Sequence, residues 1–543
     1  MKNSQNTITD FRNILGLKFS EIPQNVAPTS APIVQHPTLA DTPAYTVSVL
    51  APAPSPLPAS SANTPAATPR SEPISTTRTL TPSEVTSIFL KSLLTSAEDF
   101  LGKKVEAAVL TVPTAFSQVQ REALEKAAVD AGVPVVQLLD EAGAVASLTT
   151  SPVWTGEEDA ELAEDRTQLV IDVGSTSTSL HLLSIRQGLA YILATNNLPG
   201  TGANAIDDKV IKHFAADFTK KTKIPLQVAP ANGVADQRAE ARLRLAIEHT
   251  KRTVSASPGA ATCSVESLKD GFDYTGSINR MRFDMVAAPV YAAISEGVVA
   301  LLSTAGVDAS EVDEVVYVGG TAALPGLGER IATAVGFDED IKSKDVFAGG
   351  VGDPTSILAR GAAIQAALLS KLSKSDEEGK EVREAILSGK LSAVKATTRT
   401  VGVLFPNDRE EDVQLGGVFV PVVQKETALP ARRILEFNVG VGEAGVVSVE
   451  FWEVKEGIRV EKVKIPRDPE DEDEEDEEEE EEEIKHKIIS KEVLLGLLSL
   501  PVKKAVGGQT KVRVQVIVGI EGEMDAQLEE VGGEVVRLHL PAP

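Results

Sequence analysis

Hydrophobic residues recur with two different periods along the chain, and the change of period divides it into regions. In the first region, a capping signal at residues 81–84 precedes apolar residues at helical spacing, namely Val85, Phe89, Leu93 and Ala97. The strand-like VEAAVLTVP, the helix-like SQVQREALEKAAVDAG and the strand-like PVVQLLD follow in turn. This alternation of strands and helices predicts an α/β region with largely parallel pairing.

The same alternation continues through the middle of the chain. TQLVIDVGSTSTSLHLLSI is typical of two strands joined by a turn of small residues, and GLAYILATNNLPG of a third strand. Helical patterns follow at about 207–221, 235–255 and 281–305, and EVDEVVYVGG has the composition of a buried strand. Two actin-like α/β lobes around a nucleotide would account for this order, and a plain doubly wound sheet is the alternative.

Beyond about residue 401 the apolar positions alternate with a period of two, which predicts a β-sandwich-like second domain. We expect domains at 1–393 and 394–543, with no helical segment after the last strand. The fourteen acidic residues at 470–483 interrupt the second domain and should stay solvated. The Pro-, Ala-, Ser- and Thr-rich stretch at about 22–76 predicts a flexible insertion, although PAYTVSVL within it could form one strand.

Composition narrows the class of protein. The 53 basic and 79 acidic residues give a formal net charge of −26, which disfavours direct nucleic-acid binding. The single cysteine excludes an internal disulfide, and the six histidines do not sit at metal-ligand spacing. The N-terminus lacks the apolar run of a signal peptide, and no stretch approaches the ~18 apolar residues of a membrane span. We therefore expect a soluble, cytoplasmic protein that does not bind membranes.

Two glycine-containing turns are candidates for phosphate binding. The first is Asp172-Val-Gly174-Ser175-Thr176, where small residues let backbone N–H groups approach phosphate oxygens and Asp172 could position a hydrated Mg²⁺ ion. The second is Gly319-Gly320, after a strand. An ordinary hairpin turn and an ordinary strand-to-helix turn are the alternatives.

Further candidates lie on a helix and at a strand end. Glu248, Lys251, Arg252 and Ser255 share one side of a helix, where they could bind a ribose and an adenine edge. A solvated face with Glu248 paired to a neighbouring cation is the alternative. Glu141 could orient a water or a metal ion at the end of PVVQLLD, or it could be a surface carboxylate.

The order of these segments resembles that of the DnaK-type, seventy-kilodalton heat-shock chaperones. AVLTVPTAFSQVQREALEKAAVDAGVPVVQLLDEAGAVA, DVGSTSTSL, LRLAIEHTKRTVSAS, VVYVGGTAALPGL and SILARGAAIQAALL are similar to that family's connecting, phosphate and adenosine segments. The resemblance implies an actin-like nucleotide-binding domain, Mg²⁺ and ATP as cofactors, and Glu141 and Asp172 at the catalytic positions. It also implies cofactor contacts from the residues of both turns, from the four helix residues, and from Gly200 and Gly202.

Departures from the family pattern predict weakened nucleotide chemistry. Ser179 stands where the family's phosphate loop has its last Asp, Ala142 replaces a proline, and Ala323 replaces an arginine. The match near residues 6–19 implies that the first phosphate loop and a hydrolysis-linked lysine are missing, so we expect an incomplete first lobe, weakened ATP binding and no measurable hydrolysis.

These features resemble an atypical fungal member of the family that pairs with the J-protein zuotin in the ribosome-associated complex. The implied partners are zuotin, the ribosome through zuotin, and a second DnaK-type chaperone acting on nascent chains. The alternative is an active, ATP-hydrolysing folding chaperone whose first exon is missing from this sequence.

Overall fold

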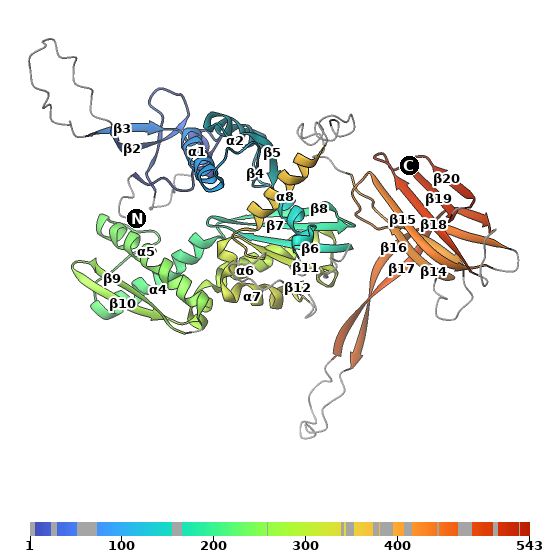
Figure 1. The fold of residues 1–543 in the computed structure, drawn as a ribbon. Coiled ribbons are helices and arrows are strands. Elements are labelled where there is room, and N and C mark those ends of the chain that lie inside the picture. The colour runs from blue at the N-terminus through green and yellow to red at the C-terminus, as the bar shows by residue number, and fades with distance from the viewer. Residues whose placement is uncertain are drawn as a thin grey trace, which may run out of the picture.

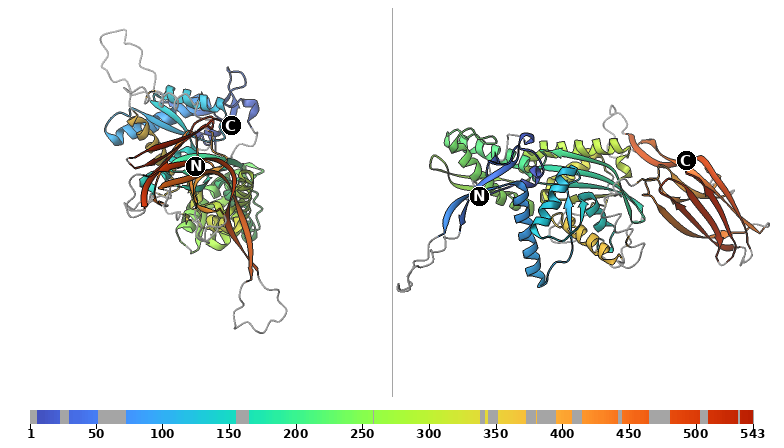
Figure 2. Two further views of the ribbon diagram at one scale, coloured as in Figure 1. Left: turned by 90° about the vertical axis from the view of Figure 1, so that its right-hand side faces the viewer. Right: turned by 90° about the horizontal axis from the view of Figure 1, so that it is seen from above.

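The protein has an α/β part and a β part that lie end to end, giving an elongated molecule (Figures 1 and 2). Its structure is a computed structural model. It describes residues 6–22, 30–51, 73–154, 165–257, 259–337, 342–343, 352–372, 380, 395–406, 415–441, 445–464, 481–502, 509–531 and 533–542.

The first lobe of the α/β part combines an antiparallel sheet, a parallel strand pair and three helices. β1, β2 and β3 form the antiparallel sheet, and β4 pairs in parallel with β5. Thr81 caps α1 through the predicted capping box, and Ser117 caps α2 in the same way. The bounds are β1 (Ile33–Gln35), β2 (Pro43–Ala51), β3 (Ile74–Leu80), α1 (Pro82–Leu101), β4 (Ala108–Val112), α2 (Gln118–Ala131), β5 (Val135–Asp140) and α3 (Glu141–Thr149).

Two expectations for this lobe are corrected. The strand considered for PAYTVSVL is confirmed as β2, which buries Tyr45. The flexible insertion expected around it is wrong where β1 and the start of β3 pair with β2. Residues 23–29 and 52–72 lie outside the described residues. On α1, Phe89 and Leu93 are half exposed rather than buried, because the helix packs on α2 through the neighbouring Leu90 and Leu94.

The second lobe is built on a five-stranded sheet with the order β12-β11-β6-β7-β8. β6 pairs antiparallel with β7 and parallel with β11. One face of this sheet shares a core with α4, α5 and α6, and the other face packs on α3 and α8. The bounds are β6 (Asp165–Val173), β7 (Ser177–Arg186), β8 (Leu189–Pro199), α4 (Ala203–Thr222), α5 (Val234–Ala256), β9 (Ala261–Lys269), β10 (Phe272–Ile278), α6 (Arg280–Ala305), β11 (Glu314–Val318), α7 (Pro325–Val335), β12 (Lys342–Ser343) and α8 (Ile357–Lys371).

Helix α6 contradicts the expectation that no segment is long and apolar enough to cross a membrane. By length and composition α6 meets that criterion, and half of its most apolar 18-residue stretch is buried inside the protein. Phe283, Tyr291 and Ile294 are buried in the core beneath the central sheet. These contacts are those of a core helix in a folded domain.

The β part consists of two four-stranded antiparallel sheets, ordered β14-β13-β16-β17 and β15-β18-β19-β20. Alternate residues of both sheets, among them Phe451, Val514 and Leu528, fill the space between them. The long β16–β17 hairpin projects from this body (Figure 1). The bounds are β13 (Thr400–Pro406), β14 (Gly417–Val423), β15 (Ala431–Gly440), β16 (Val446–Lys464), β17 (Glu481–Pro501), β18 (Gln509–Val518), β19 (Met524–Glu530) and β20 (Val535–Leu540).

The expected fold class is confirmed: an actin-like α/β part precedes a strand-rich part. From residue 395 onward, every helix or strand in the described residues is a strand, so no helical lid is seen there. Of the acidic run, residues 470–480 lie outside the described residues. Residues 481–483 belong to β17 and pair with 462–464 of β16.

Candidate functional site

The centre of the site is the turn between β6 and β7. Asp172 near the end of β6 lies directly opposite Ser179 of β7, and the turn closes through the Gly174 N–H, which donates to the Ser177 carbonyl at 3.0 Å. In the described part of the chain, the N–H groups of Ser175 and Thr176 donate no hydrogen bond. The turn therefore presents free donors beside a carboxylate.

The start of α4 holds this turn in place. The N–H groups of Ala203 and Asn204 donate to the carbonyls of Gly174 (3.0 Å) and Ser175 (2.8 Å), and Gly200 donates to Thr176 at 2.9 Å. A Cβ atom on Gly202 would come within 2.5 Å of the Ser175 carbonyl group. Only glycine allows this close approach. The structure thus brings the predicted Gly200 and Gly202 against the predicted turn.

The second glycine pair lies on the other side of Asp172. Gly319 has a positive φ of 88°, and a Cβ atom there would meet the Val173 carbonyl and come within 2.9 Å of Asp172 Oδ1. Gly320 begins a short 3₁₀ helix (Gly320–Ala323), and Thr321 donates its hydroxyl to the Gly174 carbonyl at 3.1 Å. Both predicted turns therefore form one small-residue cradle.

Two carboxyl groups lie at this cradle, Glu141 buried and Asp172 partly buried. Asp172 shares its sheet face with Val170, which packs on α3, and Glu141 is the first residue of α3. Burial, with the Asp172 charge nearby, raises the pKa of Glu141 to about 7; burial likewise raises the pKa of Asp172 to about 6. The alternative that Glu141 is a surface carboxylate is wrong, because it is only 6% exposed.

A cation that the sequence analysis did not single out faces these carboxyl groups. Arg12 Nη1 lies 4.0 Å from Glu141 Oε1, and its charge opposes the pKa rise of both Glu141 and Asp172. The adjacent Asn13 donates to the Thr176 hydroxyl at 3.2 Å. Both residues belong to a short 3₁₀ helix (Phe11–Ile14), which carries no periodic apolar pattern that could have indicated the contact.

The predicted helix residues lie together on α5, and their contacts run to α4. Lys251 Nζ is 2.8 Å from Asp207 Oδ1 of α4 and 3.1 Å from Glu248 Oε2, and Arg252 also pairs with Glu248 at 3.1 Å. The carbonyl of Ser255 accepts from Arg280 at 3.3 Å. The pairing of Glu248 with neighbouring cations, which was the alternative to a ligand role, is therefore present.

This geometry fits a nucleotide with Mg²⁺. Free N–H donors and a cradle with no room for side chains suit phosphate oxygens, and carboxylate oxygens suit a hard cation. The described residues hold no cluster of three or more metal-ligating side chains. Two carboxyl groups would bind Mg²⁺ together with phosphate and water, which is the usual mode for that ion in phosphate sites.

Comparison with known proteins adds independent information. The family model described as Hsp70 protein matches residues 59–384. A heat shock protein 70 homolog of Schizosaccharomyces pombe is 29% identical over 457 residues, covering 84% of this chain and 74% of that protein. A ribosome-associated complex subunit of Saccharomyces cerevisiae is 30% identical over 448 residues, covering 82% of this chain and 72% of that protein. A ribosome-associated molecular chaperone of S. cerevisiae is 33% identical over 301 residues, covering 55% of this chain and 46% of that protein.

Proposed function

Because this chain belongs to the Hsp70 family, we propose that it is a chaperone subunit that binds ATP with Mg²⁺ without hydrolysing it. The observation that carries the proposal is the pairing of Asp172 with Ser179 across β6 and β7. A second carboxylate at the serine position would face the same cation as Asp172. A hydroxyl there supplies no charge, so the site lacks part of the field that fixes Mg²⁺ and a water for attack.

Different residues of the site would bind the phosphates, the Mg²⁺ ion and the ribose. The Ser175 and Thr176 N–H groups would donate to phosphate oxygens, and Asp172 would hold Mg²⁺ through water. The bound ion would neutralise phosphate charge. On α5, Glu248 and Lys251 must exchange their mutual ion pair for contacts with the ribose, which weakens net binding because the existing pair has to be broken.

The partners are proposed from the sequence resemblance to the zuotin-pairing member of the family, with support from the relatives. One relative is by name a ribosome-associated complex subunit and another a ribosome-associated molecular chaperone. We place this chain in the cytoplasm, in a complex with the J-protein zuotin that contacts the ribosome. There it would help a second DnaK-type chaperone to act on nascent chains.

The test compares binding with turnover. Calorimetry with ATP and Mg²⁺ should show binding, and phosphate release should stay at background. The Ser179→Asp variant should bind ATP more tightly in the presence of Mg²⁺, and Ser179→Asn, which adds a similar side chain without charge, should not. Turnover by the unchanged chain, or no gain in Mg²⁺-dependent affinity in the folded Asp variant, would contradict the proposal.

An active ATP-hydrolysing chaperone is the second candidate, and Glu141 favours it. A buried carboxyl group with a pKa of about 7 has the properties of a general base at neutral pH. Under this alternative, a J-domain stimulates turnover and Glu141→Gln abolishes it while ATP binding persists.

A further inference from the structure

The two sheets of the β part differ in the faces that they turn away from their shared core. The outward face of the sheet β15-β18-β19-β20 is charged and internally paired. There Arg513 contacts Glu436 at 2.6 Å, and His539 contacts Asp525 at 2.7 Å. This is the usual pattern, because an antiparallel sheet that covers a core turns its other face to water. The outward face of the sheet β14-β13-β16-β17 does not follow it.

The pairing of β16 with β17 places apolar side chains on that outward face. Phe451 is buried in the core, so the next residue, Trp452, points the other way, and Leu494 lies directly opposite it. Leu497 lies opposite Glu450, and Trp452 donates its indole N–H to the Glu450 carboxylate at 2.7 Å. Trp452, Leu494 and Leu497 therefore share this face with one carboxylate.

Strands β13 and β14 extend the apolar group across the sheet. Gly402 lies opposite Trp452 on one side and Pro421 on the other. Two residues further along β13, Leu404 lies opposite Phe419. A Cβ atom on Gly402 would come within 2.3 Å of the Phe419 ring, so the ring covers the backbone of β13 there. We call the apolar residues of this face the outer patch: Leu404, Phe419, Pro421, Trp452, Leu494 and Leu497.

The outer patch is open to solvent along β17, which is an edge strand of its sheet. The side chains of Leu494 and Leu497 are 49% and 56% exposed, and Trp452 beside them is half-buried. A single exposed leucine is ordinary, but neighbouring apolar side chains that are exposed together mark a surface for binding another molecule.

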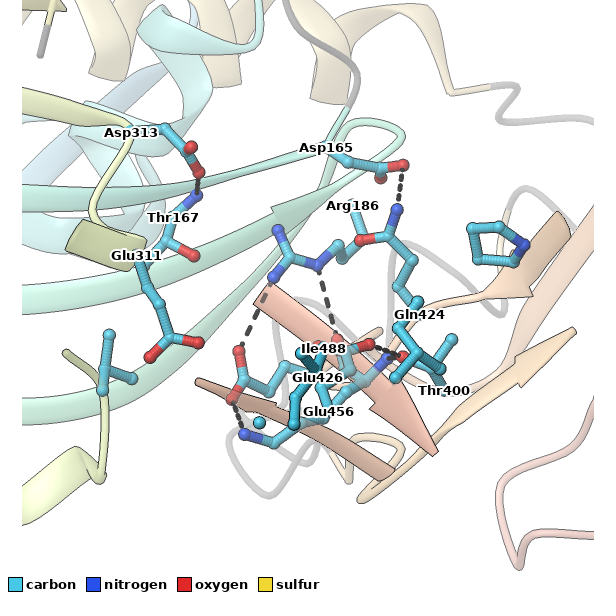
Figure 3. Close-up of a pocket in the computed structure, with 15 residues that line it drawn as sticks. Asp165, Thr167, Arg186, Glu311, Asp313, Thr400, Gln424, Glu426, Glu456 and Ile488 are labelled. Carbon is cyan, nitrogen blue, oxygen red and sulfur yellow. Dashed lines mark hydrogen bonds and ion pairs between the residues drawn. The ribbon is translucent and has the colours of Figure 1, made fainter. Parts of the chain in front are cut away.

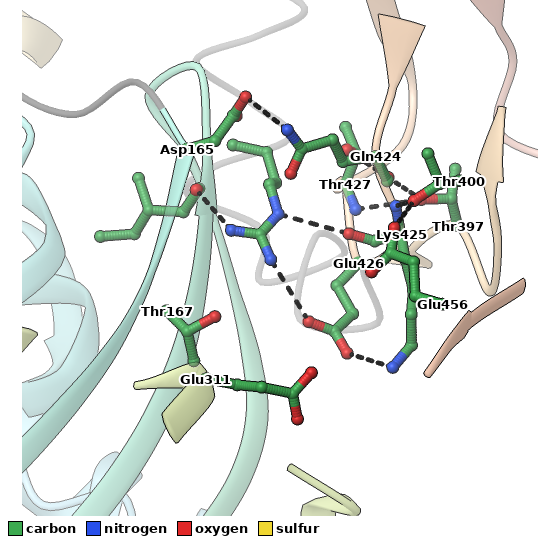
Figure 4. Close-up of polar contacts among 12 residues, drawn as sticks. Asp165, Thr167, Glu311, Thr397, Thr400, Gln424, Lys425, Glu426, Thr427 and Glu456 are labelled. Atoms are coloured by element: carbon green, nitrogen blue, oxygen red, sulfur yellow. Dashed lines mark hydrogen bonds and ion pairs between the residues drawn. The ribbon is translucent and has the colours of Figure 1, made fainter. Parts of the chain in front are cut away.

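The hairpin that carries half of the outer patch is held in place further along its length. Glu456 of β16 accepts from the Thr400 hydroxyl, which itself accepts from the Lys425 N–H at 2.8 Å (Figure 4). Ile488 of β17 lines a cleft of about 290 Å³ together with Glu311 of the α/β part (Figure 3). The outer patch therefore lies on a strand pair with a defined position.

Charge and layering indicate which occupant fits the outer patch. The fourteen acidic residues at 470–483 belong to the sequence of the same hairpin, and the chain has a formal net charge of −26. A second copy of the chain would bring the same negative charge to the contact, whereas a basic segment would be attracted. The apolar face of a sheet is commonly covered by a helix that turns an apolar stripe towards it.

We propose that the outer patch binds a basic amphipathic helix of a partner protein. Apolar side chains of the helix would pack against Trp452, Leu494 and Leu497. Lysine or arginine side chains on its flanks would be attracted by the negative charge of the hairpin. The proposal goes beyond the proposed function, because none of these residues belongs to the candidate nucleotide site.

The fluorescence of Trp452 tests this binding. The chain has two tryptophans, and the other, Trp154, is buried in the α/β part at 2% exposure. The probe is a synthetic amphipathic helical peptide of leucine and lysine. We expect it to shift the Trp452 emission to shorter wavelength in a saturable way. A peptide of the same composition in scrambled order should bind about ten-fold more weakly or less, and the corresponding leucine–glutamate peptide should not bind.

Variants locate the binding on the outer patch. Leu494→Ser combined with Leu497→Ser keeps the reporter Trp452 and should weaken peptide binding by about ten-fold or more. Leu497→Lys alone adds a charge that repels the peptide and should also weaken binding. The matched control is Ile434→Ser, because Ile434 is 46% exposed on the outward face of the other sheet, and it should leave the affinity unchanged.

Circular dichroism verifies that each variant is folded, and size-exclusion chromatography reports its oligomeric state. Equal binding of the scrambled peptide, or unchanged affinity in the folded leucine variants, would overturn the proposal. A dimer of the unchanged chain that dissociates in the double variant would also overturn it, because a second copy would then cover the outer patch.

Discussion

At the scale of single residues, Gly202 is the clearest constraint on the candidate site. A Cβ atom there would overlap the backbone of the Gly174–Ser175 turn, and backbone atoms cannot swing away as a side chain can. We expect Gly202→Ala to lower the free energy of unfolding by ~1–3 kcal/mol and to weaken ATP binding. Gly233→Ala is the matched control, because Gly233 also caps a helix and has nothing within 4 Å of a Cβ atom. Equal effects of the two variants would contradict the account.

Glu141 gives the residue-scale prediction for pH. Its pKa is about 7 in the folded protein against an ordinary value of 4.5, so between these values the native state binds more protons than the unfolded chain. Stability from this group is present below pH 4.5 and is lost as the pH rises through about 7. Between pH 5 and pH 8 the unchanged chain should lose on the order of 2 kcal/mol relative to Glu141→Gln. Denaturant unfolding at each pH measures the free energy of unfolding of the two proteins. Parallel pH profiles of the unchanged chain and Glu141→Gln would refute the prediction. The control is Glu125→Gln, a change at an exposed glutamate.

At the scale of elements, the close packing of α3 on α8 positions Glu141. A Cβ atom on Gly361 of α8 would clash with the backbone carbonyl of Ala144 on α3. Alanine favours a helix by roughly 1 kcal/mol over glycine, but here the clash should dominate, so we expect Gly361→Ala to destabilise the protein by ~1–3 kcal/mol. Gly328→Ala on α7 is the comparison, since its Cβ would meet only the Tyr317 side chain. Thermal unfolding that ranks Gly361→Ala as the more stable variant would contradict this.

Element-scale prediction from sequence succeeded where local pattern decides structure. The strands β6 and β7 and the turn containing Gly174 follow from alternation and small residues, and the N-terminus of α1 follows from its capping box. The orientation of α1 did not follow, because its burial depends on which elements pack on it. The contacts of Arg12 and Arg186 were equally unpredictable, since they join segments distant in sequence through tertiary packing.

At the scale of the whole molecule, partner binding should be visible in stability. A ligand of the native state stabilises it by mass action, by about 2.7 kcal/mol at a concentration 100 times its Kd. We therefore expect zuotin to raise the melting temperature of this chain in a concentration-dependent way. A J-protein from another compartment, at the same concentrations, is the control. Equal shifts with both proteins, or no shift with zuotin, would contradict the proposed partnership.

The central claim is that this Hsp70 family member holds ATP without hydrolysing it. The most direct measurement loads the purified chain with ATP and Mg²⁺, incubates it with and without a J-domain, and identifies the nucleotide recovered from the protein. The account predicts intact ATP in both samples, at the level seen with Glu141→Gln. Recovery of ADP that requires Glu141 and increases with the J-domain would contradict it.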